Sequence, residues 1–286
     1  MKNFTKTLTA GLLALSLAGC GSNDAATTET SAPTEAGGTL TVMCTANPHG
    51  DILEAAKPIL KEQYNIDLEI EISDDYYIQN EAVSNGDVDA NFYQHVPFFE
   101  ESKETNGFKI SNVGGVHIEP FGIYSKSITD VADIPDGAKV IISNSVADNG
   151  RILSILADAG LVTLPEGADE LTVTIADIDN EENNPKGLVF EEIKPELTPT
   201  AYENGEGDLV AINGNYALQA GLSPANDALI LEEADESNPY VNIVVCQEGH
   251  EEDPNIVALV DVLQSDEIKD FITEKWSDGS VLPVNN

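Results

Sequence analysis

Residues 38–73 read GTLTVMCTANPHGDILEAAKPILKEQYNIDLEIEIS. The stretch begins with a β-branched run that is typical of a strand, and residues 51–65 follow with the apolar spacing of an amphipathic helix. Residues 66–73 then return to a strand pattern. A strand, a helix and a second strand in this order favour two parallel strands joined by a helix, which is the unit from which α/β folds are built.

The same alternation continues through most of the chain. Residues 80–89 favour a helix, and a strand at 139–144 is followed by a helix at 149–161. Further runs continue the series at residues 171–178, 188–193, 208–221 and 240–246, and closing helices are expected at 255–276. Strands that alternate with helices of this length predict mostly parallel sheets with helices on both faces. The predicted fold class is α/β.

The length of the chain bounds the number of lobes. With 286 residues, 41% of them hydrophobic, the chain is long enough for two lobes with separate cores. Extended segments follow loops at residues 115–126 and 238–245, where the chain would pass between the lobes and return. We expect a first lobe of residues 39–116 plus 243–286, and a second lobe of residues 117–242.

The first twenty residues, MKNFTKTLTAGLLALSLAGC, carry two lysines, an apolar run, small residues and a cysteine. The apolar run is much shorter than the ~20 residues that a bilayer core requires, so it indicates a secretory signal and not a membrane span. Residues 17–20 resemble the bacterial lipobox, in which the signal is removed before the cysteine and the thiol is acylated. We expect a signal peptide at residues 1–19 and a lipid such as palmitate on Cys20. The alternative is an ordinary signal peptide with an incidental cysteine.

The segment after the lipobox is expected to be a flexible tether. Residues 21–38 contain no aromatic and no large aliphatic side chain, so they cannot offset the entropy lost on ordering. Residues 20–38 would therefore form a lipidated cysteine and a tether. This predicts a lipid-anchored protein at the extracytoplasmic face of the cell membrane.

Charge excludes one class of partner. The 51 acidic residues outnumber the 13 basic ones and give a net charge of −38. A chain this acidic repels phosphate backbones, so no nucleic acid partner is expected.

Neither a metal nor a cofactor is predicted. The motifs CxxC, HxH and HExxH are absent, and the four histidines are scattered along the chain. Cys44 and Cys246 lie in apolar runs that look like buried strands. A disulfide between them and two unpaired thiols in a core are both compatible with the sequence.

Arg151 is the only arginine, and every other basic residue is a lysine. A guanidinium group is a planar fork that can bind a carboxylate through two parallel hydrogen bonds. The segment SNSVADNGRILSIL predicts that Arg151 lies in the first turn of a helix, where unpaired backbone N–H groups also favour an anion. We expect Arg151 to bind the carboxylate of a ligand. The alternative is a salt bridge, on the surface or between lobes, to one of the many acids.

Aromatic residues crowd into residues 90–100, ANFYQHVPFFE. The segment follows a polar helix end and contains a proline, so it is interpreted as the end of a strand followed by a loop. Tyr93 and Phe98, with Tyr76 upstream, would form the aromatic walls of a pocket, and His95 would reach its rim. The alternative is ordinary core packing.

Asn213 and Asn242 lie at the edges of expected strands, beside turn-forming residues. An amide can donate to a carboxylate and accept from an ammonium group, although each asparagine taken alone is more often a turn residue. Together with the arginine and the rings, the amides suit a zwitterion with a soft apolar side chain. Thioethers pack favourably against rings, by roughly 0.3–1.5 kcal/mol per contact. Methionine fits this description best.

A series of segments after the tether reads DYYIQNEA, GDVDANFYQHVPF, HIEPFGIYSK, NGR, NPKGL, AINGNYALQAGL, SPANDA, NPYVNIVV and QSDEI. In this order they resemble the NlpA-type methionine-binding lipoproteins of ABC importers, over essentially all of residues 39–286. The resemblance implies a two-lobed periplasmic-binding-protein fold that closes on free methionine in the cleft between the lobes. It also implies the importer permease and its ATPase subunits as partners, and no enzymatic activity. We expect a monomer.

The resemblance assigns roles to matching positions. Tyr76, Tyr93, His95 and Phe98 would surround the methionine side chain. Arg151 and Asn213 would face the carboxylate, and Asn242 the amino group. The family usually has phenylalanine at the position of Tyr93 and often tyrosine at that of Phe98, and it commonly has a proline before the arginine. These departures bear on fine specificity more than on the binding role.

Other functions compete with methionine binding. An enzyme would need a nucleophile with a base or a metal in reach, and His95 has no serine or cysteine companion in a motif such as GxSxG. A surface adhesin would also suit a lipid anchor and a tether, but it has no use for a lone arginine beside an aromatic pocket. Another apolar amino acid, or a methionine-containing dipeptide, is the alternative ligand.

Overall fold

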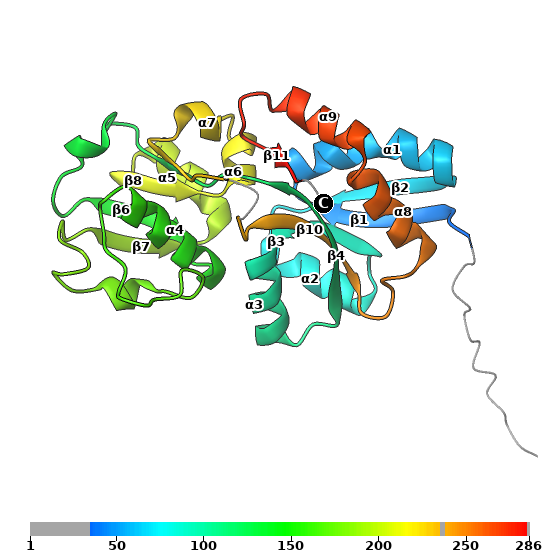
Figure 1. Cartoon of the computed structure of the whole chain (residues 1–286), viewed down its shortest axis with the longest axis horizontal. Coiled ribbons are helices and arrows are strands. Elements are labelled where there is room, and N and C mark those ends of the chain that lie inside the picture. The colour runs from blue at the N-terminus through cyan, green and yellow to red at the C-terminus, as the bar shows by residue number, and fades with distance from the viewer. Residues whose placement is uncertain (1–34, 235–237, 285–286) are drawn as a thin grey trace, which may run out of the picture. The chain divides into compact units, whose positions relative to one another are not determined.

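Two sheets with flanking helices carry residues 35–234 and 238–284, which are the residues that the computed structural model describes (Figure 1). Both sheets lie within one compact unit. The predicted signal peptide, Cys20 and most of the predicted tether lie outside the described residues. Among the described helices, none has the length and apolar character needed to cross a membrane. The predicted α/β class is confirmed.

The first sheet has six strands in the order β11-β4-β10-β3-β1-β2. Its strands are β1 (Gly38–Cys44), β2 (Ile66–Ile72), β3 (Ala90–His95), β4 (Ile110–Ile118), β10 (Val241–Gln247) and β11 (Leu282–Pro283). The opening stretch forms the predicted unit, because β1 pairs in parallel with β2. However, β10 runs antiparallel to both of its neighbours and β11 runs antiparallel to β4, so the sheet is mixed and the prediction of a mostly parallel sheet is wrong here. Antiparallel pairing is available to β10 because this strand returns from the second sheet and does not follow a crossover helix.

Helices cover both faces of the first sheet (Figure 1). Helices α1 (Asp51–Tyr64), α8 (Pro254–Leu263) and α9 (Asp266–Lys275) lie on one face, and α2 (Tyr76–Asn85) and α3 (Val96–Asn106) on the other. Alternate residues of β10 mark the two faces. Val244 and Cys246 belong to the core under the first group of helices, whereas Ile243 and Val245 belong to the core under α2 and α3. Cys44 and Cys246 are both buried free thiols.

The second sheet has five strands in the order β7-β6-β8-β5-β9. They are β5 (Gly122–Tyr124), β6 (Lys139–Ser143), β7 (Val189–Ile193), β8 (Leu209–Ile212) and β9 (Ile230–Leu231). Strand β6 is parallel to β7 and β8, and β5 is antiparallel to β8 and β9. The helices of this region are α4 (Val146–Asp158), α5 (Thr198–Asn204), α6 (Gly214–Gln219) and α7 (Pro224–Asp227). Short turns of other helix types occur at η1 (Ala46–Gly50), η2 (Val131–Asp133), η3 (Ile175–Ile178) and η4 (Pro195–Leu197).

The chain passes between the sheets twice. It leaves the first sheet after Ile118 and enters the second at Gly122, and it returns between Leu231 and Val241. Both connections therefore bring the ends of β4 and β10 next to residues of the second sheet. The candidate site is built around these two strand ends.

Residues 96–106 form helix α3, although a loop was expected after the strand. The proline that argued for a loop lies in the first turn of the helix, where a missing N–H does no harm. His95 caps this helix, because its Nδ1 accepts a hydrogen bond from the backbone N–H of Phe98. The helix thus fixes the relative positions of an imidazole and a ring that the sequence analysis had placed on a loop.

Residues 171–178 do not form a strand. Only the short turn η3 occurs there, and its start is stabilised by a reciprocal pair of hydrogen bonds between Thr174 and Asp177. The side chain of Asp169 also accepts from the backbone N–H of Leu171. Short polar side chains that bond to nearby backbone groups favour turns over sheet pairing, and this preference overrides the β-branched pattern.

Candidate ligand-binding site

One cavity brings together all seven side chains that the sequence analysis selected as ligand-binding. It contains about 390 Å³ of empty space, counting the part that is open to solvent. The selected residues on its wall are Tyr76, Tyr93, His95, Phe98, Arg151, Asn213 and Asn242. Five more residues complete the lining: Gln94, Glu119, Asp148, Gly214 and Asn215. The lining comes from elements of both sheets, although these residues are far apart in the sequence.

Aromatic rings form one wall of the cavity. The ring of Tyr76 lies 5.6 Å from Tyr93 and 5.8 Å from Phe98 between centroids, and it stacks on Tyr216 at 4.9 Å. These four rings belong to a single apolar cluster that also contains residues of β5, β6 and β8. Aromatic pairs at such separations stabilise one another beyond their buried area. The expected pocket wall and the alternative of core packing are therefore both realised by the same rings.

The hydroxyl groups of this wall are already bonded within the protein. The hydroxyl of Tyr93 donates to the backbone carbonyl of Tyr76 at 2.9 Å, and the hydroxyl of Tyr216 donates to that of Asp74 at 2.6 Å. The hydroxyl of Tyr76 donates to Oδ1 of Asn215. Burial raises the pKa of Tyr93 well above its ordinary value, so this hydroxyl keeps its proton. This wall therefore presents ring surface to the cavity.

Arg151 lies in the middle of helix α4 and not in its first turn, because the helix begins at Val146. The sequence analysis was wrong on this point, and the unpaired N–H groups of the helix start do not support an anion at Arg151. Instead, its Nε donates to Glu232 at 2.8 Å and its Nη2 donates to the same carboxylate at 2.5 Å. Nη2 also donates to the backbone carbonyl of Glu119 at 2.8 Å. The alternative prediction of a salt bridge is thus realised.

The guanidinium group nevertheless keeps hydrogen-bonding capacity. Its plane lies over the ring of Tyr240, with 4.1 Å between Cζ and the ring centroid. Burial by itself would lower the pKa of Arg151, but the charge and hydrogen bonds of Glu232 raise it. Among the described residues, Nη1 forms no hydrogen bond. Arg151 lines the cavity, and one nitrogen of its charged guanidinium group is therefore not used by a protein acceptor in the described part of the chain.

Asp148 is a buried acid of the cavity that the sequence analysis did not select. Its Oδ1 lies 3.2 Å from Nε2 of His95, and its Oδ2 accepts from Nδ2 of Asn213 at 3.2 Å. Because Nδ1 of His95 accepts from a backbone N–H, Nε2 carries the proton and donates to Asp148. Burial alone would raise the pKa of Asp148, but His95, Asn213 and Arg151 together lower it. The cavity therefore contains an ionised carboxylate.

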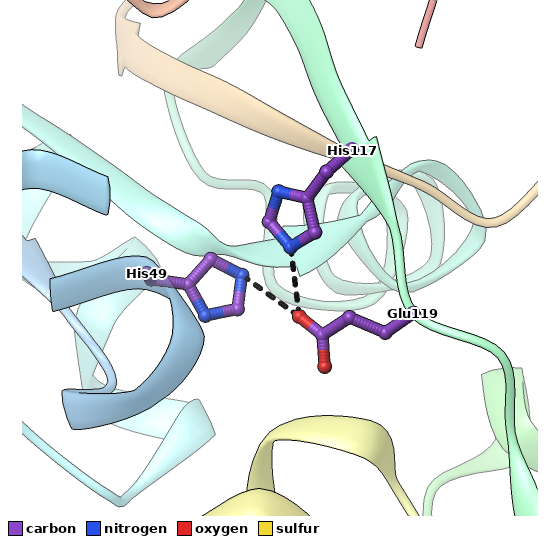
Figure 2. Close-up of side chains that lie close together, drawn as sticks. All are labelled: His49, His117 and Glu119. Atoms are coloured by element: carbon purple, nitrogen blue, oxygen red, sulfur yellow. Dashed lines mark hydrogen bonds and ion pairs between the residues drawn. The ribbon is translucent and has the colours of Figure 1, made fainter. Parts of the chain in front are cut away.

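A second buried acid, Glu119, joins two histidines (Figure 2). Its Oε1 lies 2.9 Å from Nε2 of His117 and 3.3 Å from Nε2 of His49. The sequence analysis treated the histidines as scattered, whereas the fold brings these two together from η1 and β4. Burial lowers the pKa of His49 to about 4 and that of His117 to about 3, and burial raises the pKa of Glu119. Both imidazoles are neutral near pH 7 and each donates its Nε2–H.

His49 extends this cluster to one of the predicted site residues. Its Nδ1 lies 2.7 Å from Oγ1 of Thr45, and its Nε2 lies 3.0 Å from Oδ1 of Asn242. Because Nε2 faces a carboxylate, it carries the proton, and Nδ1 accepts from the threonine hydroxyl. The Asn242 side chain is therefore held by its oxygen atom.

His49, His117 and Glu119 are also the residue types that bind metals, and their ligand atoms lie within 4.8 Å of one another. Coordination through both Nε2 atoms would move each proton to Nδ1. Nδ1 of His49 would then meet Thr45, but Nδ1 of His117 has no partner among the described residues. In the structure as it stands, this Nδ1 is an unpaired acceptor, and the three side chains are joined by hydrogen bonds and ion pairs through their Nε2 atoms and Oε1.

Weak signals in the sequence could have led to the acids that were missed. Glu119 directly follows strand β4, in the same HIEPF segment that was expected to link the lobes. Asp148 comes three residues before Arg151, one helical turn away on the same face. Residues at strand ends and within one turn of a selected side chain are candidates for the same site.

Two α/β sheets joined by two connections, with a cavity lined from both, define a substrate-binding protein of the periplasmic type. The sequence model of the NlpA lipoprotein family matches residues 40–285, and the chain belongs to this family. The resemblance found in the sequence is thereby confirmed.

Named relatives agree with this membership. The methionine-binding lipoprotein MetQ of Bacillus subtilis is 45% identical over 271 residues, which cover 94% of each chain. A nutrient-binding protein of Burkholderia cenocepacia, solved bound to methionine, is 31% identical with a TM-score of 0.79, covering 85% of this chain and 99% of that one. An ABC transporter periplasmic substrate-binding protein of Coxiella burnetii is 33% identical with a TM-score of 0.79, covering 86% of this chain and 100% of the other.

Proposed function

We propose that this protein is an extracytoplasmic substrate-binding lipoprotein that captures free methionine and delivers it to an ABC importer. The observation that carries the proposal is the cavity, which joins a wall of aromatic rings to a wall of amides and charged groups. The relatives named as methionine-binding support it, since they match this chain over most of its length.

The two walls suit the two ends of methionine. The thioether would lie against the rings of Tyr76, Tyr93 and Phe98, where sulfur gains roughly 0.3–1.5 kcal/mol per ring contact. The zwitterionic end would face the polar wall, where Arg151 offers a charged donor to the carboxylate. Binding at such a site needs no nucleophile and no metal, so we propose that the protein is not an enzyme.

Further parts of the proposal concern the location and partners of the protein. We propose that Cys20 carries a lipid and that residues 21–38 tether the folded part to the membrane. Two lobes, residues 39–116 plus 243–286 and residues 117–242, would close on the ligand as a monomer. The importer permease and its ATPase subunits would receive it. Cys20→Ala should abolish metabolic palmitate labelling and release the protein from membranes, and continued labelling would contradict the anchor.

Calorimetry with the purified protein tests the ligand. Methionine should bind more tightly than norleucine or leucine, because neither competitor carries a sulfur atom, and more tightly than glycylmethionine, which is longer. Methionine should also raise the melting temperature, since a ligand at 100 times its Kd stabilises the folded state by about 2.7 kcal/mol. An unchanged melting curve at millimolar methionine would overturn the proposal. If the dipeptide or leucine binds more tightly than methionine, we would conclude that this compound is the ligand.

A further inference from the structure

Tyr93 lies at an irregularity in strand β3. On β10, Ile243 pairs with Gln94. The next residue, Val244, pairs with Phe92, so Tyr93 is an extra residue in β3. The pairing of β3 with β1 ends at Phe92, before the irregularity. Tyr93 therefore occupies a β-bulge beside the cavity that it lines, and bulges at such places re-aim a side chain.

The bulge changes which side chains share a face of the sheet. In a regular strand, Asn91 and Gln94 would point to opposite faces, because side chains alternate along it. Here both of them contact Asn80 on helix α2, which covers the face of the sheet opposite α1 (Figure 1). Phe92 instead belongs to the core under α1. One extra residue thus brings two amides to the same face.

These side chains form a hydrogen-bonded group, which we call the amide cluster of Asn80, Asn91 and Gln94. Oδ1 of Asn80 accepts from Nδ2 of Asn91 at 2.9 Å and from Nε2 of Gln94 at 2.6 Å. In return, Nδ2 of Asn80 donates to Oε1 of Gln94 at 2.8 Å and to Oγ of Ser102 on α3 at 3.2 Å. All four side chains are buried. The cluster therefore joins β3 to both helices of this face.

One hydrogen bond of the cluster spans the bulge. Nε2 of Gln94 donates to Oδ1 of Asn91 at 3.0 Å, which links the part of the strand before the bulge to the part after it. Nδ2 of Asn91 also donates to the backbone carbonyl of Gln79, so each of the three amide nitrogens has two acceptors. Without the extra residue, Gln94 would turn to the other face, and buried donors would lose these acceptors at a cost in stability. The cluster thus favours the bulged strand over a regular one.

The ring of Tyr93 depends on the two elements that Asn80 joins. Its backbone belongs to the bulge of β3, and its hydroxyl donates to the backbone carbonyl of Tyr76, the first residue of α2. Within the aromatic wall, the rings pack on one another. Such packing has no preferred direction, whereas the paired amides are directional and specify one arrangement of the strand and the helix.

We propose that the amide cluster of Asn80, Asn91 and Gln94 is a positioning device for ligand selectivity: it fixes the bulge of β3 and thereby the ring of Tyr93 that the thioether meets. This inference rests on the proposed function. Asn80 and Asn91 are not among the described residues that line the cavity, so they act through Tyr93 and not by contact with the ligand.

Asn80→Ala and Asn91→Ala, made separately, each remove one member of the cluster and leave the lining of the cavity unchanged. Competition measures the ratio of the affinities for methionine and norleucine. Each variant should lower this ratio about two- to tenfold, which is the range that one displaced contact between ring and sulfur allows. Ser102→Ala removes only one acceptor of Asn80 and should lower it less. A ratio that is unchanged in every variant that folds would overturn the inference.

Val83→Ala is the matched control for a merely structural effect. Val83 is buried on α2, one turn after Asn80, in a core that is separate from the ring cluster of the cavity. Its truncation should lower the melting temperature, because it leaves a cavity, but it should not alter the ratio. If the ratio falls equally in the control and in the cluster variants, the effect is a general loosening of the lobe and the inference is wrong.

A double-mutant cycle tests whether the cluster acts through Tyr93. Tyr93→Leu should lower the ratio by itself, and adding Asn80→Ala should then lower it little further, because the ring that Asn80 positions is already gone. An unchanged ratio in Tyr93→Leu, or fully additive losses, would contradict the inference. The unmodified protein is measured first. If it binds no methionine, the proposed function fails, whereas this inference alone fails if only the variants disagree.

Discussion

The two walls of the cavity differ in how completely the protein satisfies them. The rings of Tyr76, Tyr93 and Phe98 pack on one another, and the hydroxyl groups of the two tyrosines donate to protein acceptors. In the polar wall, Oδ1 of Asn213 and Nδ2 of Asn215 are instead buried without hydrogen-bond partners among the described residues. The aromatic wall would be stable without a ligand, whereas the polar wall is completed by one. Binding energy should therefore depend more on the polar wall, and selectivity for the side chain more on the rings.

The two walls also differ in what holds them. Rings are held by non-directional packing within a shared core, which tolerates small changes of shape. The polar wall is held by directional bonds among buried groups, in which the loss of one member leaves another unpaired. Substitutions in the polar wall should accordingly have the larger effects.

Arg151→Ala should reduce methionine affinity more than any other substitution considered. A smaller effect would contradict the larger role of the polar wall. Removing the guanidinium group leaves a ligand carboxylate without its charged partner, so methionine affinity should fall by roughly 2–5 kcal/mol. The melting temperature should also fall, because the nearly buried Glu232 loses its cation. Calorimetry and thermal unfolding measure both. Arg151→Lys should restore only part of the affinity, since a point charge cannot replace the fork. An alanine variant that binds like the parent would refute the assigned role.

The two buried histidines, His49 and His117, should make the stability of the protein sensitive to acid. The pKa values of His49 and His117 are about 4 and about 3 in the folded protein, against 6.5 for an unperturbed histidine. Between pH 6.5 and 4 the unfolded chain binds more protons, so the free energy of unfolding should fall as the pH falls through this range. The shift of His49 alone corresponds to roughly 3 kcal/mol. The raised pKa of Glu119 acts in the opposite direction and reduces the total.

Urea unfolding at several pH values measures this dependence. His117→Gln should flatten it, because glutamine can donate to Glu119 without titrating. His250→Gln is the matched control, since His250 is exposed and lies outside the cavity. The interpretation fails if the His117 variant and the parent lose stability equally between pH 6.5 and 4.

Phe98→Leu should give the smallest effect and sharpen the account of selectivity. Leucine keeps an apolar side chain but removes the ring, so methionine should lose about 0.3–1.5 kcal/mol while norleucine loses less. Phe99→Leu is a matched control, because Phe99 is a buried neighbour on the same helix that belongs to a different core. Competition between methionine and norleucine measures the ratio for each variant. If both leucine variants change this ratio equally, the ring of Phe98 does not contribute to selectivity for the thioether.

Sequence analysis was most successful where the type of one residue indicates its role. A lone arginine, a crowded aromatic segment and two amides near strand ends could be selected without coordinates, and the fold places all of them on one cavity. The alternation of strand and helix patterns likewise determined the α/β class, because apolar periodicity is a local property of the chain. The same local reasoning failed at residues 96–106, where a proline was taken as the sign of a loop and begins a helix instead.

The sequence could not show which side chains form hydrogen bonds with one another. His49, His117 and Glu119 are separated by as many as 70 residues. They come together because β4, which carries His117, lies in the same sheet as β1, which precedes His49. Which atom of Asn213 and Asn242 faces the cavity depends on the carboxylate that each side chain meets across the fold. The sequence thus indicated seven of the side chains that line the cavity, because residue identity sets chemistry, but it did not indicate the buried acids Glu119 and Asp148. The tertiary structure decided whether each amide can offer a donor or an acceptor to a ligand, because a hydrogen bond within the protein occupies one atom of the group and leaves the other.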